Sequence, residues 1–288
     1  MPVLDQIKIA GQYVLPKHLL SRLLGKLASA RAGSLTTTLI KTFIRKYQVD
    51  MSEALHPEPE HYLTFNDFFT RALKPEARSI VEDANTLALP VDGTVSQLGA
   101  ISHGRIFQAK GHDFSARELL GGYDQDAALF DEGDFATIYL APKDYHRIHM
   151  PMAGKLEKML FVPGDLFSVN PLTAENVPNL FARNERVVAI FSSEQGPFAM
   201  VLVGATIVAS IETVWEGTIA PARQGGSKEV KVWDYSEQDI RLEKGQEMGR
   251  FKLGSTIVAL FPKDTLTFAQ ELCPGSVTRL GQPFAHLK

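Results

Sequence analysis

The sequence predicts an α+β protein, with amphipathic helices at the N-terminus followed by a mostly antiparallel β body of sandwich or barrel-like form. Its 288 residues, 44% of them hydrophobic, suffice for a substantial core. Apolar residues recur at helical spacing before residue 50. From about residue 87, short runs of Val, Ile, Phe and Tyr alternate with Gly, Pro, Asp and Asn. These dense turn signals favour antiparallel packing over βαβ units. We therefore expect a helical segment over residues 1–80 and a β-rich catalytic domain over residues 81–288.

The first 50 residues differ in charge from the rest of the chain. They contain eight Lys or Arg and two Asp, whereas the remainder holds 22 basic and 31 acidic residues. Apolar spacing predicts one basic amphipathic helix from Pro16 to Leu27 and a second from Leu35 to Tyr47. Such helices can lie in the interface of an anionic membrane, or pack on the core as an ordinary hairpin with solvated lysines. The acidic body and the lack of a recognition motif argue against nucleic acid as a partner.

A shorter helix is predicted from Phe65 to Leu73, with Thr64 as its cap and the Lys74-Pro75 step as its end. In the β body, the Ser193–Pro197 stretch between two apolar runs predicts a hairpin turn. The clearest predicted strands are Phe135–Leu140, Leu156–Val162, Val187–Phe191, Phe198–Val203, Thr206–Trp215 and Thr256–Phe261.

Composition argues against several classes of site and protein. A single cysteine, Cys273, allows no intramolecular disulfide and fits a reducing compartment. The eight histidines lack paired cysteines at ligand spacing, so we expect no metal. Apolar stretches such as Phe198–Ile211 are interrupted by Gly and Ser, which argues against a transmembrane helix. Met1–Ile9 lacks the features of a secretory signal, so we expect the mature chain to begin near Met1.

The Gly254-Ser255 step, directly before an apolar run, is the first candidate for chemistry. Most Gly-Ser steps are ordinary turns. This one also permits backbone self-cleavage, because glycine leaves its carbonyl open to attack by the Ser255 hydroxyl, and a strained turn would assist the shift from amide to ester. Elimination at the Ser255 Cα would break the ester. Hydrolysis of the resulting dehydroalanine would leave a pyruvoyl group at the start of a new chain.

A serine hydroxyl needs a base, and His146 and His149 lie together in a segment bounded by prolines. Their spacing of three places them on one face of a helix but on opposite faces of a strand, and the prolines favour an irregular loop. Asp92, at a Pro/Gly turn before a predicted strand, completes a Ser/His/Asp arrangement. In it, Asp92 would orient the histidine that takes the Ser255 proton. Each of these residues also has an ordinary structural interpretation.

Two other functions fit the same residues. A conventional serine hydrolase would use Ser255, His149 and Asp92, although no Gly-x-Ser-x-Gly elbow surrounds the serine. A non-enzymatic, membrane-peripheral β module would make the His and Ser motifs incidental. The hydrolase would be active as an intact chain, whereas only self-processing demands a pyruvoyl-blocked fragment.

Four segments taken together resemble one known family. They are Phe65–Arg78, Pro90–Gly93, Asp144–Pro151 and Leu253–Thr256, and their order and the short tail after Ser255 also match. The chain resembles the pyruvoyl-dependent phosphatidylserine decarboxylases of the bacterial membrane-associated type.

The resemblance implies cleavage into a β chain of residues 1–254 and a 34-residue α chain, 255–288, blocked by pyruvate derived from Ser255. It implies that Asp92 and His149 form the relay that activates Ser255. It also implies that the pyruvoyl group forms a Schiff base with phosphatidylserine and that CO2 leaves to give phosphatidylethanolamine. We expect His146, from its spacing to His149, to protonate the former Cα. The resemblance further implies a homodimer, bound peripherally to the cytoplasmic face of the bacterial inner membrane.

Overall fold

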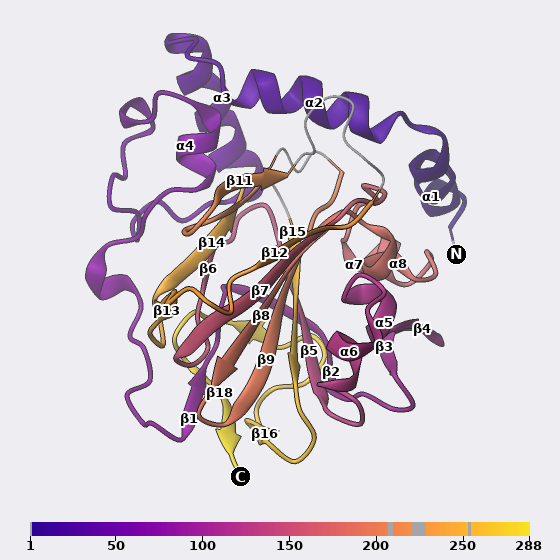
Figure 1. The fold of residues 1–288 in the computed structure, drawn as a ribbon. Coiled ribbons are helices and arrows are strands. Elements are labelled where there is room, and N and C mark those ends of the chain that lie inside the picture. The colour runs from indigo at the N-terminus through magenta and orange to yellow at the C-terminus, as the bar shows by residue number, and fades with distance from the viewer. Residues whose placement is uncertain (1, 207–209, 221–228, 253–254) are drawn as a thin grey trace.

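The computed structural model describes residues 2–206, 210–220, 229–252 and 255–288 (Figure 1). Its helices lie at the N-terminus and along one face of the β body. In chain order the helices are α1 (Val3–Val14), α2 (Lys17–Ala28), α3 (Ser34–Tyr47), α4 (Phe65–Phe69), α5 (Ala116–Leu119), α6 (Asp124–Ala128), α7 (Pro171–Ala174) and α8 (Leu180–Arg183), with 3₁₀ turns η1 (Pro59–His61) and η2 (Pro75–Ala77).

The strands that make the β body are short, and most are bounded by turns. They are β1 (Thr86–Ala88), β2 (Gly93–Ala100), β3 (Arg105–Ala109), β4 (His112–Ser115), β5 (Asp134–Leu140), β6 (Arg147–His149), β7 (Gly154–Val162), β8 (Arg186–Ser193), β9 (Gly196–Val203), β10 (Ile211–Thr213), β11 (Gly217–Ala220), β12 (Lys231–Asp234), β13 (Arg241–Leu242), β14 (Glu247–Phe251), β15 (Ser255–Phe261), β16 (Leu266–Phe268), β17 (Val277–Thr278) and β18 (Pro283–Leu287).

These strands form open antiparallel sheets. The largest has the order β12-β7-β8-β9-β15-β5-β2-β17, with β13 also pairing with β7. A second sheet has the order β11-β10-β14-β6, a third has the order β1-β18-β16, and β3 pairs with β4. Among the described residues the edge strands β12 and β17 of the large sheet do not pair with each other. The prediction of an antiparallel α+β protein is confirmed, and the barrel-like alternative is wrong.

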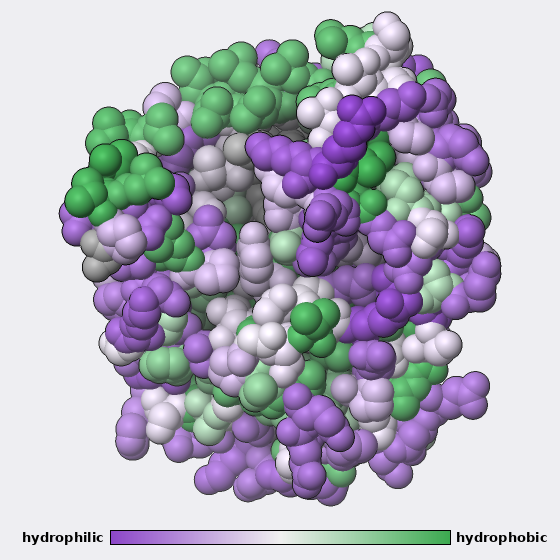
Figure 2. All heavy atoms as spheres, turned by 180° about the vertical axis from the view of Figure 1, so that it is seen from behind, coloured by the Kyte–Doolittle hydropathy of each residue, from purple (hydrophilic) through white to green (hydrophobic). Residues whose placement is uncertain are grey.

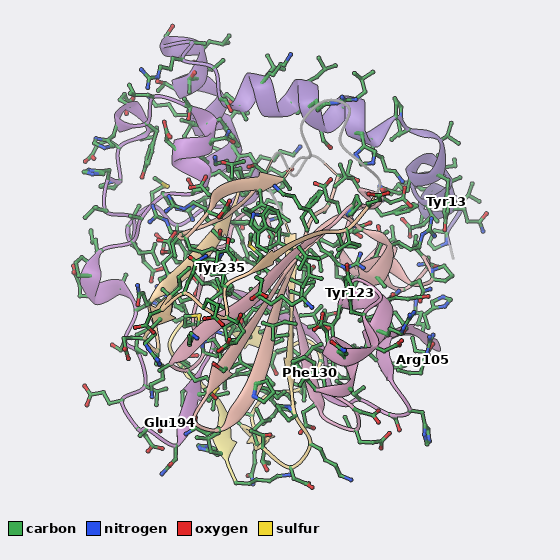
Figure 3. The ribbon with its side chains drawn as sticks, in the orientation of Figure 1. Tyr13, Arg105, Tyr123, Phe130, Glu194 and Tyr235 are labelled. Carbon is green, nitrogen blue, oxygen red and sulfur yellow. The ribbon has the colours of Figure 1, made fainter. Side chains whose placement is uncertain are left out.

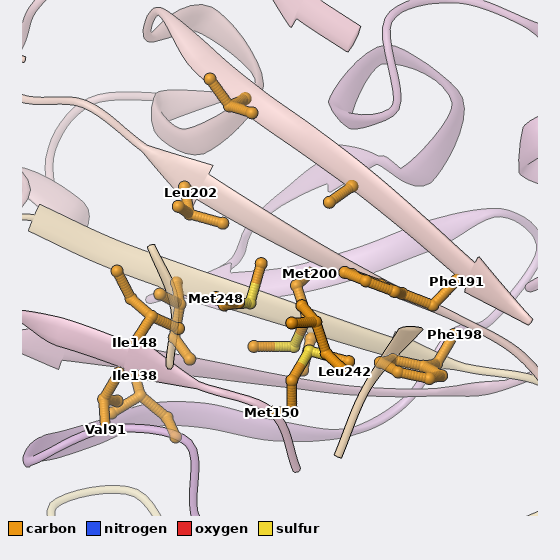
Figure 4. Packing of buried hydrophobic residues seen from close by; sticks show 14 of the residues in the cluster. Val91, Ile138, Ile148, Met150, Phe191, Phe198, Met200, Leu202, Leu242 and Met248 are labelled. Atoms are coloured by element: carbon orange, nitrogen blue, oxygen red, sulfur yellow. The ribbon is translucent and has the colours of Figure 1, made fainter. Parts of the chain in front are cut away.

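Both faces of the large sheet are covered. Along β15, Ile257 and Ala259 face one core and Val258 and Leu260 face another, as strand alternation requires. The first core lies between the large sheet on one side and the four-stranded and three-stranded sheets on the other. Figure 4 shows its packing from close by. The second core is closed by short helices and the β3–β4 hairpin. A sheet that is apolar on both faces needs a covering layer on each.

The N-terminal helices lie over one end of the β body (Figure 1). α3 and α4 share a third core, in which the ring centroid of Phe43 lies 5.1 Å from that of Phe65 and 6.0 Å from that of Phe69. The helix α1 is not among those predicted from the sequence. Its Tyr13 ring packs edge-on against Phe167, with the centroids 5.1 Å apart.

The cap predicted for α4 is present, but the helix is shorter than predicted. The Thr64 side chain accepts a hydrogen bond from the Asp67 backbone, and the Asp67 side chain accepts one from the Thr64 backbone. The helix ends at Phe69, because the chain then turns so that Leu73 forms an antiparallel bridge with Ala54. A tertiary pairing therefore ends the helix before the Lys74-Pro75 step does.

The predicted hairpin is confirmed, with Ser193 opposite Gly196 where β8 and β9 meet. Most predicted strands occur within a few residues of their expected bounds. The predicted strand over Thr206–Trp215 is too long. Its described part contains only β10, and residues 207–209 lie outside the described residues.

Candidate active site

Ser255 is the first residue of β15, which lies between β5 and β9 in the large sheet. It is fully buried opposite Leu140 of β5, and its Oγ has no hydrogen-bond partner among the described residues. The predicted cleavage partner, Gly254, lies outside the described residues. Thr137, Ser210 and Thr256 also have buried hydroxyls without partners among the described residues, so the missing partner leaves the Ser255 hydroxyl free to react but does not by itself single it out.

The predicted cleavage step lies between a strand of one sheet and a strand of another. β14 of the four-stranded sheet ends at Phe251, and β15 of the large sheet begins at Ser255. By strand alternation Ser255 shares a face with Ile257, which packs in the core between these two sheets. That core also contains Ile148 of β6, the strand that carries His149. The serine side chain therefore faces the four-stranded sheet, whose strand β6 contains His149.

His149 is held by two hydrogen bonds in β6. Its Nδ1 lies 2.8 Å from the Gly245 carbonyl oxygen and donates to it, because a carbonyl can only accept. In the neutral ring, Nε2 then carries the lone pair and accepts from the Tyr145 hydroxyl at 3.2 Å. Burial lowers the pKa of His149, although the hydrogen bond to Gly245 partly opposes this. His149 is thus a neutral imidazole whose Nε2 is able to take a proton.

His146 is completely buried just before β6. Its Nδ1 donates to the Asp144 carbonyl oxygen at 2.8 Å, and its Nε2 has no partner among the described residues. The ring lies against Phe69, with the centroids 4.1 Å apart. Burial lowers the pKa of His146 to about 3. At neutral pH this side chain is therefore uncharged, with an unused basic nitrogen.

The prolines around the two histidines predict an irregular loop, and the structure differs for part of it. Residues 147–149 form β6, which pairs with β14 so that His149 lies opposite Glu247. His146 lies just outside this strand, and its carbonyl oxygen accepts a hydrogen bond from the Phe251 N–H at 3.0 Å. Pairing with β14 gives the end of the segment a regular strand that local sequence does not predict.

Asp92 is held by a charged partner and by the backbone. Arg78 donates to both of its carboxylate oxygens, with the Nε to Oδ1 bond at 3.1 Å. The Leu280 N–H also donates to Oδ1, at 2.8 Å. No hydrogen bond joins Asp92 to His149 in the described part of the chain. The two are nevertheless close, because the His149 N–H donates to the Pro90 carbonyl oxygen at 2.9 Å and the Asp92 charge acts to raise the pKa of His149.

The structure thus brings Asp92, His146, His149 and Ser255 to one region, and their catalytic roles stay a prediction. Chemical reasoning from the sequence missed Arg78 and Tyr145, which contact Asp92 and His149 directly. Both lie inside the segments that carry the family resemblance. An arginine or a tyrosine does not indicate by its type which side chain it will contact, so the sequence does not predict these two hydrogen bonds. In the described residues, no group of three or more His, Cys, Asp or Glu is placed to hold a metal ion.

Comparison with known proteins identifies the family. The family described as phosphatidylserine decarboxylase matches residues 65–286, and one described as PSD matches residues 7–48. A phosphatidylserine decarboxylase proenzyme of Psychromonas ingrahamii is 71% identical over 98% of each chain. Proenzymes of the same name from Shewanella frigidimarina and Shewanella amazonensis are 66% and 64% identical, over 99% of this chain and 99% and 100% of theirs. The chain belongs to the phosphatidylserine decarboxylase family.

Proposed function

We propose that the chain cuts its own backbone between Gly254 and Ser255 and that the product decarboxylates phosphatidylserine to phosphatidylethanolamine. The supporting observation is the buried, unpartnered Ser255 hydroxyl at the start of a central strand, in a chain of this family. The core on the Ser255 face also contains Ile148 of β6, and the two neutral histidines lie in and just before that strand. The residues present fit a serine that becomes a pyruvoyl group.

In the cleavage step, His149 Nε2 takes the Ser255 hydroxyl proton as Oγ attacks the Gly254 carbonyl carbon. The amide C–N bond breaks as the protonated His149 gives its proton to the Ser255 nitrogen, and an ester forms. Removal of the Ser255 Cα proton then breaks the ester C–O bond, leaving the Gly254 carboxylate and a dehydroalanine, which water converts to a pyruvoyl group with loss of ammonia. To act on Ser255, His149 must exchange its hydrogen bond from Tyr145 for one from the serine. Asp92, held by Arg78, favours the charged histidine that results.

In the mature protein, the pyruvoyl group supplies a ketone that condenses with the substrate amine and accepts electrons as CO2 leaves. The chain's own contribution is proton transfer. His146 Nε2 has no proton in the neutral ring, so it first accepts one, which the substrate ammonium can supply as it becomes a free amine. It then delivers that proton to the former Cα. Because burial lowers the pKa of this ring, it does not hold the proton in the resting protein, so proton uptake is coupled to the condensation at residue 255.

Cleavage leaves the two products bound to each other. The α chain contributes β15, which pairs with β5 and β9, as well as β17, which pairs with β2. Its β18 pairs with β1 of the β chain. We therefore infer that residues 255–288 stay within the sheets after the peptide bond is cut.

We also propose that residues 1–80 form a membrane-associating segment, beside a catalytic domain over residues 81–288. None of the described helices is long and apolar enough to cross a membrane. Leu19, Leu23 and Leu27 of α2 are 52%, 52% and 66% exposed. Figure 2 shows apolar side chains gathered along the upper edge of the molecule, in the region of the N-terminal helices. A two-tailed substrate lies in a bilayer, which favours peripheral docking through these leucines at the cytoplasmic face of the bacterial inner membrane. The homodimer implied by the resemblance stays a prediction.

The activity is tested with the purified full chain and phosphatidylserine labelled in the serine carboxyl group. Presented in anionic vesicles, the lipid is expected to release labelled CO2 and to yield phosphatidylethanolamine in equal amount. Hydrolysis to free serine or fatty acid without release of CO2 would instead favour the serine-hydrolase alternative.

Membrane docking is tested by changing the exposed leucines of α2. We expect Leu19→Ser, Leu23→Ser and Leu27→Ser combined to weaken sedimentation with anionic vesicles by at least about tenfold, because burial of each leucine contributes about 1.5–3 kcal/mol. Val277→Ser is the matched control, since Val277 is 79% exposed in the β body. Unchanged binding of the triple variant would contradict docking through α2.

A further inference from the structure

Arg71 is a buried cation that the proposed chemistry does not yet use. It follows α4, is 4% exposed, and donates from one terminal nitrogen to the Lys143 carbonyl oxygen at 3.2 Å. Its guanidinium lies 5.6 Å from the centroid of the Phe68 ring. The Nε atom has no acceptor, and the guanidinium forms no ion pair, within the described residues. The residues outside those ranges include no Asp or Glu, so they cannot supply a carboxylate.

Another buried arginine, Arg186, shows what a purely structural guanidinium looks like here. It donates to the backbone carbonyls of Glu118, Leu119, Ala182 and Asn184, so its donors are satisfied by the fold. Arg71 has one such bond among the described residues. Burial lowers the pKa of Arg71, and the nearby Tyr62, Asp92, Tyr145 and Asp144 side chains only partly oppose this. An anionic ligand would supply the partner that the described residues do not.

Arg71 contacts the loop that runs from Leu140, the β5 residue opposite Ser255, to His146. Leu140 lies opposite Ser255, and Lys143, the hydrogen-bond partner of Arg71, comes three residues later. The next turn of the loop leads to His146, whose pKa the Arg71 charge helps to lower. Three residues span at most about 11 Å, so Arg71 contacts this loop close to the strand position that pairs with Ser255.

The neighbouring cations are already paired with carboxylates. Arg147 lies 2.9 Å from Glu247, which also pairs with Arg250 at 2.9 Å. Lys252 lies 2.7 Å from Glu212. Among the described residues Lys143, in the loop itself, also has no ion pair, but its side chain is exposed to solvent, whereas Arg71 is buried.

We propose that Arg71 binds the phosphate of phosphatidylserine while the serine part of the headgroup reacts at residue 255, an inference that rests on the proposed function. Phosphatidylserine has two anionic groups, and the chemistry separates them. A cation on the carboxylate would stabilise the ground state against loss of CO2, because the negative charge leaves the carboxyl oxygens in the transition state. The phosphate keeps its charge throughout and is separated from the amine by two carbons and an ester oxygen. The planar fork of arginine also matches two phosphate oxygens.

The inference is tested by binding, without turnover. The mature protein is first reduced with borohydride, which converts the ketone to an alcohol, and is then titrated calorimetrically with glycerophosphoserine or with L-serine. We expect Arg71→Gln to weaken glycerophosphoserine binding about 10- to 100-fold, as loss of a charge-assisted hydrogen bond does, and to leave L-serine binding unchanged. Arg71→Lys, which keeps the charge without the fork, is expected to fall between. In turnover, KM for phosphatidylserine is expected to rise more than kcat falls.

The matched control is Arg105→Gln, because Arg105 is half-exposed, pairs with Asp113 and lies far from α4 (Figure 3). The proposal is overturned if Arg71→Gln binds glycerophosphoserine as wild type does, or loses equal affinity for both ligands. If Arg71→Gln is not processed, Arg71→Lys provides the comparison, and wild-type affinity in that variant contradicts the proposal. The intact mass of the wild-type protein distinguishes failure of the Arg71 proposal from failure of self-cleavage. Absence of a 34-residue fragment would overturn self-cleavage, whereas the binding measurements test Arg71.

Discussion

Ser255→Ala is expected to abolish both backbone cleavage and decarboxylation. Alanine has no hydroxyl to attack the preceding carbonyl, so neither the ester nor the pyruvoyl group can form. The variant is expected to fold, because the Ser255 Oγ has no hydrogen-bond partner to lose within the described chain. Denaturing electrophoresis and a CO2-release assay measure the two losses separately.

The neighbouring Thr256 supplies a close control for this variant. Its Oγ1 is also buried without a partner in the described chain, and Thr256 is the second residue of the same strand. By alternation its side chain lies on the opposite face of the sheet from Ser255. Thr256→Val keeps the volume, so we expect the chain still to be cleaved. Loss of cleavage in Thr256→Val equal to that in Ser255→Ala would mean that loss of the serine hydroxyl alone does not explain the Ser255→Ala result.

His146→Ala is expected to leave self-cleavage largely intact while lowering kcat by about 10²–10⁴-fold, the usual contribution of a general acid. The physical reason is that His146 offers an unused Nε2, whereas the Nε2 of His149 is the base assigned to Ser255. His149→Ala is the contrasting variant and is expected to accumulate as the uncleaved chain.

The readouts are the fraction of cleaved chain and the turnover of the cleaved fraction alone. An uncleaved His146→Ala chain would contradict the assignment and would make His146 the base for cleavage. Full turnover by this variant would show that another group protonates the product carbon.

Local patterns predicted the elements whose determinants lie close together in the chain. The alternation along residues 255–261 and the turn at Ser193–Pro197 gave β15 and the β8–β9 hairpin, because both depend on neighbouring residues. The Thr64 cap was found for the same reason. The early end of α4 and the strand at His149 are not predicted by local patterns, because each is set by pairing with a segment that is distant in the sequence.

The candidate site shows the same division. Gly254, Ser255, the two histidines and Asp92 were found because their chemistry is visible in short motifs, and the family resemblance joined those motifs. The partners that hold them were not found. Arg78 reaches Asp92 across 14 residues, and Leu280 reaches it across 188. Which donor meets which acceptor over such distances depends on the sheet register, which a single sequence does not specify.

Self-cleavage between Gly254 and Ser255 is checked by the intact mass of the purified wild-type protein under denaturing conditions. We expect two species, a fragment of residues 1–254 ending in a glycine carboxylate and a 34-residue fragment of residues 255–288 whose first residue has the mass of pyruvoyl in place of serine. A single unbroken chain of 288 residues that still releases CO2 from phosphatidylserine would contradict it.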